Sequence, residues 1–84
     1  MKTDEELIKQ FQSGNEDSFN ELVKRHLPGT YGFFIKFTAD PVEAEDLAQD
    51  VFIKMYKALK KFRFQSKFKT YLYRANINLS LIHI

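Results

Sequence analysis

Apolar residues recur every three or four positions along almost the whole chain, and we find no convincing strand-like alternation. Helical spacing lines apolar side chains along one face, where packing against other helices buries them. The periodic segments run from Thr3 or Asp4 to Gln12, from Glu16 to about Phe37, from Pro41 to about Lys60, and from Ser66 or Lys67 through Leu79. The sequence therefore predicts a compact all-α domain of three to four helices.

Residues with strong positional preferences mark the ends of these segments. Gly14 suits a left-handed turn after the first helix, and Asn15 suits the N-cap of the second. The clearest boundary is Asp40-Pro41-Val42-Glu43, with an N-cap Asp, a proline at the first helical position and a Glu at N3. Pro28-Gly29 predicts a break or kink in the second segment. Residues 61–66 lose the helical period and are predicted to form a loop.

The side chains expected in the core come from the apolar stripe of each segment. They are Leu7, Ile8 and Phe11; Phe19, Leu22, Val23, Leu27, Tyr31, Phe34 and Ile35; Ala44, Leu47, Val51, Met55, Ala58 and Leu59; and Phe68, Leu72, Ala75 and Leu79. Phe62 is also interpreted as a core ring, whereas core and binding-site positions are about equally supported for Phe64.

Length and composition exclude several classes of protein. With 84 residues the chain forms one small domain, and without cysteine it has neither a disulfide framework nor a thiolate site. No apolar run approaches the roughly 20 residues of a membrane span, and residues 1–10 are too charged for a signal peptide. A cytoplasmic protein without membrane insertion is expected.

No residue pattern of an enzyme or a cofactor site is found. His26 and His83, the only histidines, are far apart in sequence and lack metal-ligand spacing. Glu43, Asp46 and Asp50 share one face of the third predicted helix, but a solvated face explains them better than acid–base catalysis does. The chain is therefore predicted to have no catalytic activity, no cofactor and no metal.

Charge divides the chain into two halves. All eleven Asp and Glu residues lie in residues 1–50, which carry a net charge of −6, whereas residues 51–84 carry +8. Seven of the thirteen aromatic residues also lie in the basic half: Phe52, Tyr56, Phe62, Phe64, Phe68, Tyr71 and Tyr73. Cations neutralise phosphates and rings stack on unpaired bases, so the basic half suits single-stranded nucleic acid. The acidic half suits a second, basic partner.

The candidate nucleic-acid site lies in residues 63–78. Tyr71, Arg74 and Asn78 fall at i, i+3 and i+7 and place a ring, a guanidinium and an amide on one helix face. The preceding loop supplies Ser and Gln side chains that can line a pocket for one unstacked base; its residues are Arg63, Phe64, Gln65, Ser66 and Lys67. A helix lying on a membrane surface is less well supported, because this face is not a wall of lysines.

A second candidate surface lies on the third predicted helix. Its members recur at i, i+3, i+4 and i+7 and are Asp46, Gln49, Asp50 and Ile53. Two carboxylates, an amide and an aliphatic side chain on one face suit a partner helix rich in arginine. From spacing alone, a solvated face is favoured over a docking face by about two to one.

Residues 44–52 are Ala-Glu-Asp-Leu-Ala-Gln-Asp-Val-Phe and residues 67–74 are Lys-Phe-Lys-Thr-Tyr-Leu-Tyr-Arg, with residues 56–62 bridging them. The first block resembles the start of region 2.2 of bacterial sigma factors, and the second resembles their region 2.3–2.4 helix. Gly14-Asn15, Phe19 and Asp40-Pro41 are similar to the pattern of the extracytoplasmic-function (ECF) group. The resemblance covers about residues 4–80 and implies a σ2 domain over the single domain 1–84.

The resemblance implies two partners. In this family the acidic region 2.2 helix docks on the clamp helices, a coiled coil in the β′ subunit of RNA polymerase. By position, this role falls on Asp46, Gln49, Asp50 and Ile53, and the resemblance thus favours a docking face over a solvated one. An anti-sigma factor is a further candidate partner.

Regions 2.3–2.4 of the family open the promoter −10 element and trap a flipped base of the non-template strand. The resemblance assigns the base pocket to the residues around Phe64–Lys67. It assigns base contacts and strand separation to Lys69, Thr70, Tyr71, Arg74 and Asn78. Unpairing a base costs a few kcal/mol, which stacking and phosphate contacts can offset.

The chain departs from the family pattern at three places. Tyr71 stands where many members carry Trp, and Asn76 stands at a position that is usually small and apolar. The end, residues 81–84, is apolar where the family continues with charged residues. The region 4 helix-turn-helix domain that reads the −35 element is not expected in this chain.

Two other functions stay open from the residues alone. One is a sequence-indifferent single-strand-binding module, in which the acidic face is merely solvated. The other is a helical adaptor that binds only proteins, for which no salt-dependent oligonucleotide binding is expected.

Overall fold

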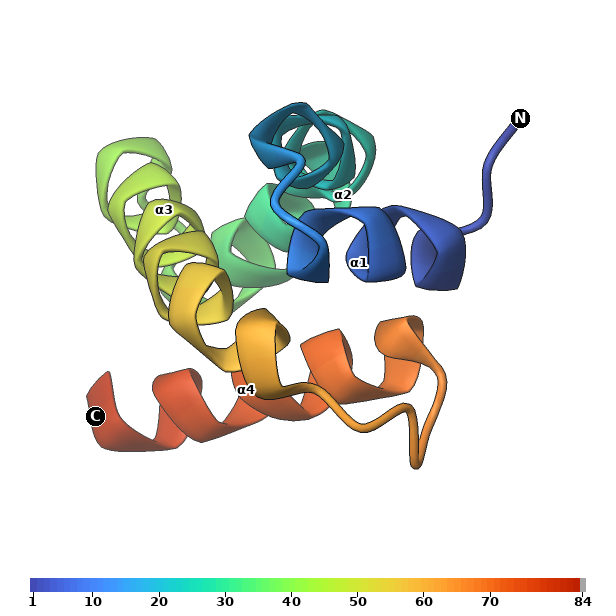
Figure 1. Cartoon of the computed structure of the whole chain (residues 1–84). Helices are drawn as coiled ribbons and strands as arrows, with labels where there is room; N and C mark the ends of the chain where they lie inside the picture. The colour runs from blue at the N-terminus through green and yellow to red at the C-terminus, as the bar shows by residue number, and fades with distance from the viewer. Residues whose placement is uncertain (84) are drawn as a thin grey trace.

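The computed structural model describes residues 1–83, which form four α-helices and one 3₁₀ helix. The elements are α1 (Asp4–Gln12), α2 (Glu16–Thr38), α3 (Pro41–Ala58), η1 (Leu59–Lys61) and α4 (Phe68–His83). α2 packs along α3 and α1 packs on α2, while α4 crosses one side of these helices in contact with α2 and α3 (Figure 1). No strand occurs within residues 1–83. The prediction of an all-α domain is confirmed.

α1 begins with a capping box. Thr3 is the N-cap, and its hydroxyl accepts a hydrogen bond from the Glu6 backbone N–H at 3.1 Å. The Glu6 carboxylate accepts one in return from the Thr3 N–H at 3.0 Å, which holds the pKa of Glu6 below its usual value of 4.5. Of the two N-caps predicted, the structure selects Thr3. Asp4 instead accepts from Arg25 at 3.1 Å and lies 2.8 Å from His26 Nε2.

The turn after α1 is a Schellman motif. Gly14 adopts the predicted left-handed backbone, with φ of 106°. Its N–H donates to the Phe11 carbonyl at 2.9 Å, and the Asn15 N–H donates to the Gln10 carbonyl at 3.0 Å. Asn15 is then the N-cap of α2, although its side chain makes no capping hydrogen bond.

α2 continues through Pro28 as one helix of 23 residues. Pro28 has no N–H, so the Lys24 carbonyl loses its helical partner. Both residues are exposed, which places the lost hydrogen bond on the solvent side of the helix. The predicted interruption is therefore not a break, and the helix ends at Thr38, one residue past the predicted end.

The boundaries of α3 and α4 differ in detail from those predicted. α3 starts as expected, with the Asp40 carboxylate accepting from the Val42 N–H at 3.1 Å. It was predicted to run as a single helix to about Lys60. In the structure it ends at Ala58, because residues 59–61 form the tighter 3₁₀ helix η1. α4 begins at Phe68, whose N–H donates to the Glu5 carboxylate of α1 at 2.9 Å.

One core joins all four helices. Most of the predicted core side chains are buried, and Ala48 and Phe52 are buried as well. The half-buried exceptions are Val23, Leu27, Tyr31, Ile35, Ala58, Phe62 and Ala75. Phe11, Phe19 and Tyr56 pack as a cluster of tilted and edge-on rings, with centroids 5.0–5.3 Å apart, and this cluster joins α1, α2 and α3. At the apolar C-terminal end Leu81 and Ile82 are exposed, and Ile84 lies outside the described residues.

Thr30 of α2 and Asn76 of α4 are two of the four polar residues buried in the described part of the chain. Thr30 is 2% exposed and Asn76 is 5% exposed. Within the described residues, neither Thr30 Oγ1 nor Asn76 Oδ1 has a hydrogen-bond partner. An unsatisfied buried polar atom destabilises a fold by about 1–3 kcal/mol. Asn76 therefore weakens the core at a position that is usually small and apolar in the family it resembles.

We expect Asn76→Ala to raise the free energy of unfolding by about 1 kcal/mol, because the gain from removing an unpaired oxygen exceeds the packing lost. Urea unfolding followed by circular dichroism measures this change. Asn78→Ala is the matched control, since Asn78 is exposed on the same helix and should leave stability unchanged. A lower unfolding midpoint for Asn76→Ala than for the native chain would contradict this account.

Candidate functional site

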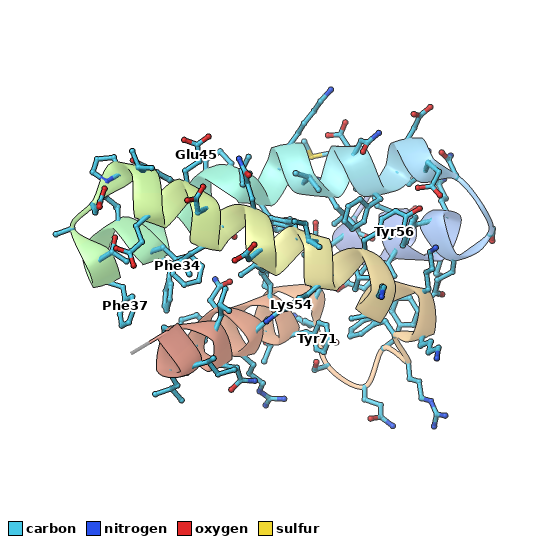
Figure 2. All side chains as sticks on the ribbon, turned by 90° about the vertical axis from the view of Figure 1, so that its left-hand side faces the viewer. Phe34, Phe37, Glu45, Lys54, Tyr56 and Tyr71 are labelled. Carbon is cyan, nitrogen blue, oxygen red and sulfur yellow. The ribbon has the colours of Figure 1, made fainter. Side chains whose placement is uncertain are left out.

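The acidic surface predicted on the third helix lies on the outer side of α3. Asp46, Gln49, Asp50 and Ile53 are all exposed, and Ile53 is 67% exposed. Figure 2 views the molecule from this side, with Glu45 and Lys54 at opposite edges of α3. No ion pair within residues 1–83 involves Asp46 or Asp50, so both carboxylates face solvent with their charge uncompensated.

An apolar groove between α2 and α3 adjoins this acidic face. It has a volume of about 530 Å³ and is lined by Phe19, Val23, Leu27, Gln49, Phe52, Ile53, Tyr56 and Lys57. Gln49 and Ile53 belong to both features, so the groove and the acidic face form one continuous surface. The sequence prediction missed the groove. The sequence signal for the groove was the apolar pair Val23 and Leu27. They continue the apolar stripe of α2, and the core leaves them half-buried.

The Tyr56 hydroxyl at the edge of this groove donates to the Glu16 carboxylate of α2 at 2.7 Å. This hydrogen bond, which the ionised phenol cannot donate, raises the pKa of Tyr56 above its usual value of 10.0. Lys60 Nζ of η1 lies over the Tyr56 ring, 4.4 Å from its centroid. The wall of the groove is therefore held by contacts from α2 and η1.

The loop between η1 and α4 surrounds the second candidate site. An open depression of about 640 Å³ is lined by Ala58, Lys61, Phe62, Arg63, Gln65, Ser66, Tyr71 and Arg74. No carboxylate lines it, and three of its side chains are cationic. Tyr71 lines it from α4, beside the loop (Figure 2). The sequence prediction anticipated five of these residues from loop and helix patterns and missed Lys61, which η1 brings to the rim.

Phe64 takes an unusual position in this loop. Its backbone is left-handed, with φ of 59°, a conformation that non-glycine residues adopt only with strain. Its half-buried ring meets Phe62 edge-on, with centroids 4.9 Å apart, and Phe62 in turn stacks on Tyr71 at 4.9 Å. Phe64 does not line the depression, so the structure places it among the supporting rings.

The remaining predicted residues lie outside the depression. Lys67 and Lys69 line a separate depression of about 590 Å³ beside the start of α1, together with Arg25 and Asp4. Thr70 and Asn78 are exposed on α4 and line neither depression. Asn78 shares a helix face with Tyr71 and Arg74, as the spacing predicted. The structure thus places the cations of the candidate nucleic-acid site in the loop and in the first two turns of α4, at Lys69 and Arg74.

Within residues 1–83, no group of three or more His, Cys, Asp or Glu side chains could hold a metal ion. None of the helices formed by these residues has the length and apolar character needed to span a membrane.

Residues 22–84 match the family model of sigma-70 region 2. The chain belongs to this family. It is 40% identical to the RNA polymerase sigma-H factor of Pseudomonas aeruginosa over 84 residues, which are all of this chain and 44% of that protein. It is 35% identical over 77 residues to the ECF RNA polymerase sigma factor SigW of Bacillus subtilis, covering 92% of this chain and 41% of that protein. The chain spans less than half the length of these curated relatives.

The fold is that of a solved sigma region 2 domain. An engineered region 2 of sigmaE, determined by NMR in complex with GTAAAA, superposes with a TM-score of 0.87 and 32% sequence identity. The match covers 98% of this chain and 85% of that chain. The predicted resemblance to sigma factors of the ECF group is therefore confirmed over nearly the whole domain. The members of this family are transcription initiation factors and not enzymes.

We expect Glu16→Gln to lower the pKa of Tyr56 toward 10.0, because the carboxylate that accepts the phenol proton's hydrogen bond is lost. A raised folded-state pKa contributes stability that is present below pH 10 and is lost as the pH rises through the folded pKa. NMR titration of ring-labelled tyrosine measures it. Glu21→Gln, the same change of charge at another exposed position of α2, is the matched control and should leave the Tyr56 titration as it is. An unchanged Tyr56 titration in Glu16→Gln would contradict the assignment.

Proposed function

We propose that this chain is the σ2 module of an ECF-type sigma factor, which docks on RNA polymerase core and recognises and melts the promoter −10 element. The observation that carries the proposal is the match, at a TM-score of 0.87, to a sigmaE region 2 that was solved with the single strand GTAAAA. In this proposal the module works in the cytoplasm, where the polymerase is, and an anti-sigma factor that covers either surface is a further partner.

The docking half of the proposal rests on the outer face of α3. Asp46 and Asp50 offer carboxylates to arginine side chains, and such charge-assisted contacts are strongest when they are bidentate. Ile53 and the groove beside it accept an apolar side chain of the same partner helix. A pair of helices with arginines and apolar residues on one face, as expected of the β′ clamp helices, fits both features.

The promoter half rests on the loop and α4. The depression is large enough for one flipped base, and its cationic rim neutralises the adjacent phosphates. Tyr71 and the face that it shares with Arg74 and Asn78 continue the path for neighbouring bases. Stacking of about 1–3 kcal/mol per base offsets the few kcal/mol that unpairing costs. The depression thus stabilises an opened strand without any covalent chemistry.

We expect Asp46→Arg to weaken binding to an isolated β′ clamp-helix fragment at least tenfold, because it sets like charges against each other. Isothermal titration calorimetry measures the affinity. Glu21→Arg is the matched control: the same change in net charge at an exposed position of α2, outside the docking face. Equal loss in both variants would point to net charge alone. No binding by the folded native chain would favour the sequence-indifferent single-strand binder.

We expect Tyr71→Ala to weaken binding of the GTAAAA oligonucleotide by about 1–3 kcal/mol, the value of one lost stacking contact. Fluorescence anisotropy measures the affinity, which should also fall steeply with salt. Tyr73→Ala is the matched control, because Tyr73 is exposed on another face of α4 and contacts Phe33 of α2.

Tyr71→Trp should retain the affinity, since it keeps an aromatic face. Equal weakening by Tyr71→Ala and Tyr73→Ala would reject the assigned face. Binding that is strong but indifferent to salt would reject the phosphate contacts.

A further inference from the structure

One face of α1 holds the loop that surrounds the proposed base pocket. Glu5, Lys9 and Gln12 fall at i, i+4 and i+7 and share this face. Gln12 Nε2 donates to the Leu59 carbonyl at 2.8 Å and to the Phe62 carbonyl at 3.0 Å. These bonds join α1 to η1 and to its C-cap residue, 47 and 50 positions further along the chain, and they fix the start of the loop.

The other end of the loop is held by the first turn of α1. The Glu5 carboxylate accepts a hydrogen bond from the Phe68 N–H at 2.9 Å, and this N–H is an otherwise unpaired donor at the start of α4. Between the two ends, Lys9 Nζ lies 5.5 Å from the centroid of the Phe64 ring. Three side chains of one short helix thus contact the loop at its start, its middle and its end.

The loop has little to hold it in shape by itself. Within residues 1–83, no hydrogen bond involves residues 63–66, which include most of the predicted pocket. Phe64 also needs its left-handed backbone, which persists only where the surroundings impose it. The restraint on this segment therefore comes from α1 and from the rings of Phe62 and Tyr71.

We propose that the polar face formed by Glu5, Lys9 and Gln12 positions the base pocket, so that α1 takes part in strand capture without touching the strand. This inference rests on the proposed function, since it assumes that the depression binds an unpaired base. The apolar face of α1, formed by Leu7, Ile8 and Phe11, belongs to the core. The two faces are separate, so positioning and folding can be tested apart.

The physical benefit is preorganisation. A loop that samples many shapes binds more weakly than a fixed one. Its apparent affinity is the intrinsic affinity multiplied by the fraction of time that the loop spends in the binding-competent shape. Hydrogen bonds at both ends and a cation above the central ring raise that fraction before the strand arrives. The positioning residues are therefore Glu5, Lys9 and Gln12. The contacts with the strand itself come from Tyr71 and the cations at the rim.

The test compares Gln12→Met with Gln10→Met in the full chain. Methionine keeps the length and helix propensity of glutamine but removes the donor. Gln10 is the matched control, because its Oε1 accepts from Ser18 of α2 and from Lys2, away from the loop. We expect Gln12→Met to weaken GTAAAA binding by about three- to tenfold, while Gln10→Met and the clamp-helix affinity of both variants stay unchanged.

A second readout needs no nucleic acid. In Gln12→Met the backbone order parameters of residues 63–67 should fall toward about 0.6, the value of a flexible segment, and in Gln10→Met they should not. A second pair tests the other end of the loop. Glu5→Ala should weaken GTAAAA binding, whereas Glu5→Gln retains an acceptor for the Phe68 N–H and should restore most of the affinity.

The outcomes separate this inference from the proposed function. If the native chain does not bind GTAAAA, the proposed function fails and the inference falls with it. If the native chain binds and Gln12→Met binds equally well with unchanged order parameters, the inference alone is overturned. Equal weakening by Gln12→Met and Gln10→Met would also overturn it, because α1 would then contribute only general stability.

Discussion

The packing of α1 against α2 and η1 is the constraint on which the rest of the domain depends. A helix of nine residues is not stable alone in water, so α1 exists only because its apolar face is buried. Phe11 joins Phe19 and Tyr56 in the ring cluster, and Ile8 is fully buried. The same helix bonds to both ends of the loop before α4. The short helix α1 thus completes the core and also restrains the loop before α4.

A single core carries two surfaces of opposite charge, and α3 connects them. Its outer face presents the carboxylates of Asp46 and Asp50, while its inner face packs on α2 and α4. The domain measures 37 × 22 × 19 Å, so the two surfaces lie close together on the same core. In the proposed function, this shared core lets docking on the polymerase position the site of strand opening.

The sequence predicted much of this because its signals are local. Helical spacing, the Asp40-Pro41 start and the left-handed Gly14 each act within a few residues, and the structure has all three. Predictions that depended on distant contacts were less accurate. The start of α4 at Phe68 follows from a carboxylate that is 63 positions away, and α2 passes through Pro28 because the lost hydrogen bond lies on the solvent side.

The sequence by itself determined the all-α class, most of the core and the division of charge, since amphipathic spacing and composition require no knowledge of neighbours. Only the tertiary structure decided how the candidate site residues are grouped. It packed Phe64 against Phe62, separated Lys67 and Lys69 from the depression, and brought Lys61 to its rim. It also created the apolar groove beside Ile53. Pockets form where side chains from different helices meet, and the crossing of helices is set by packing across the whole core, which no local pattern encodes.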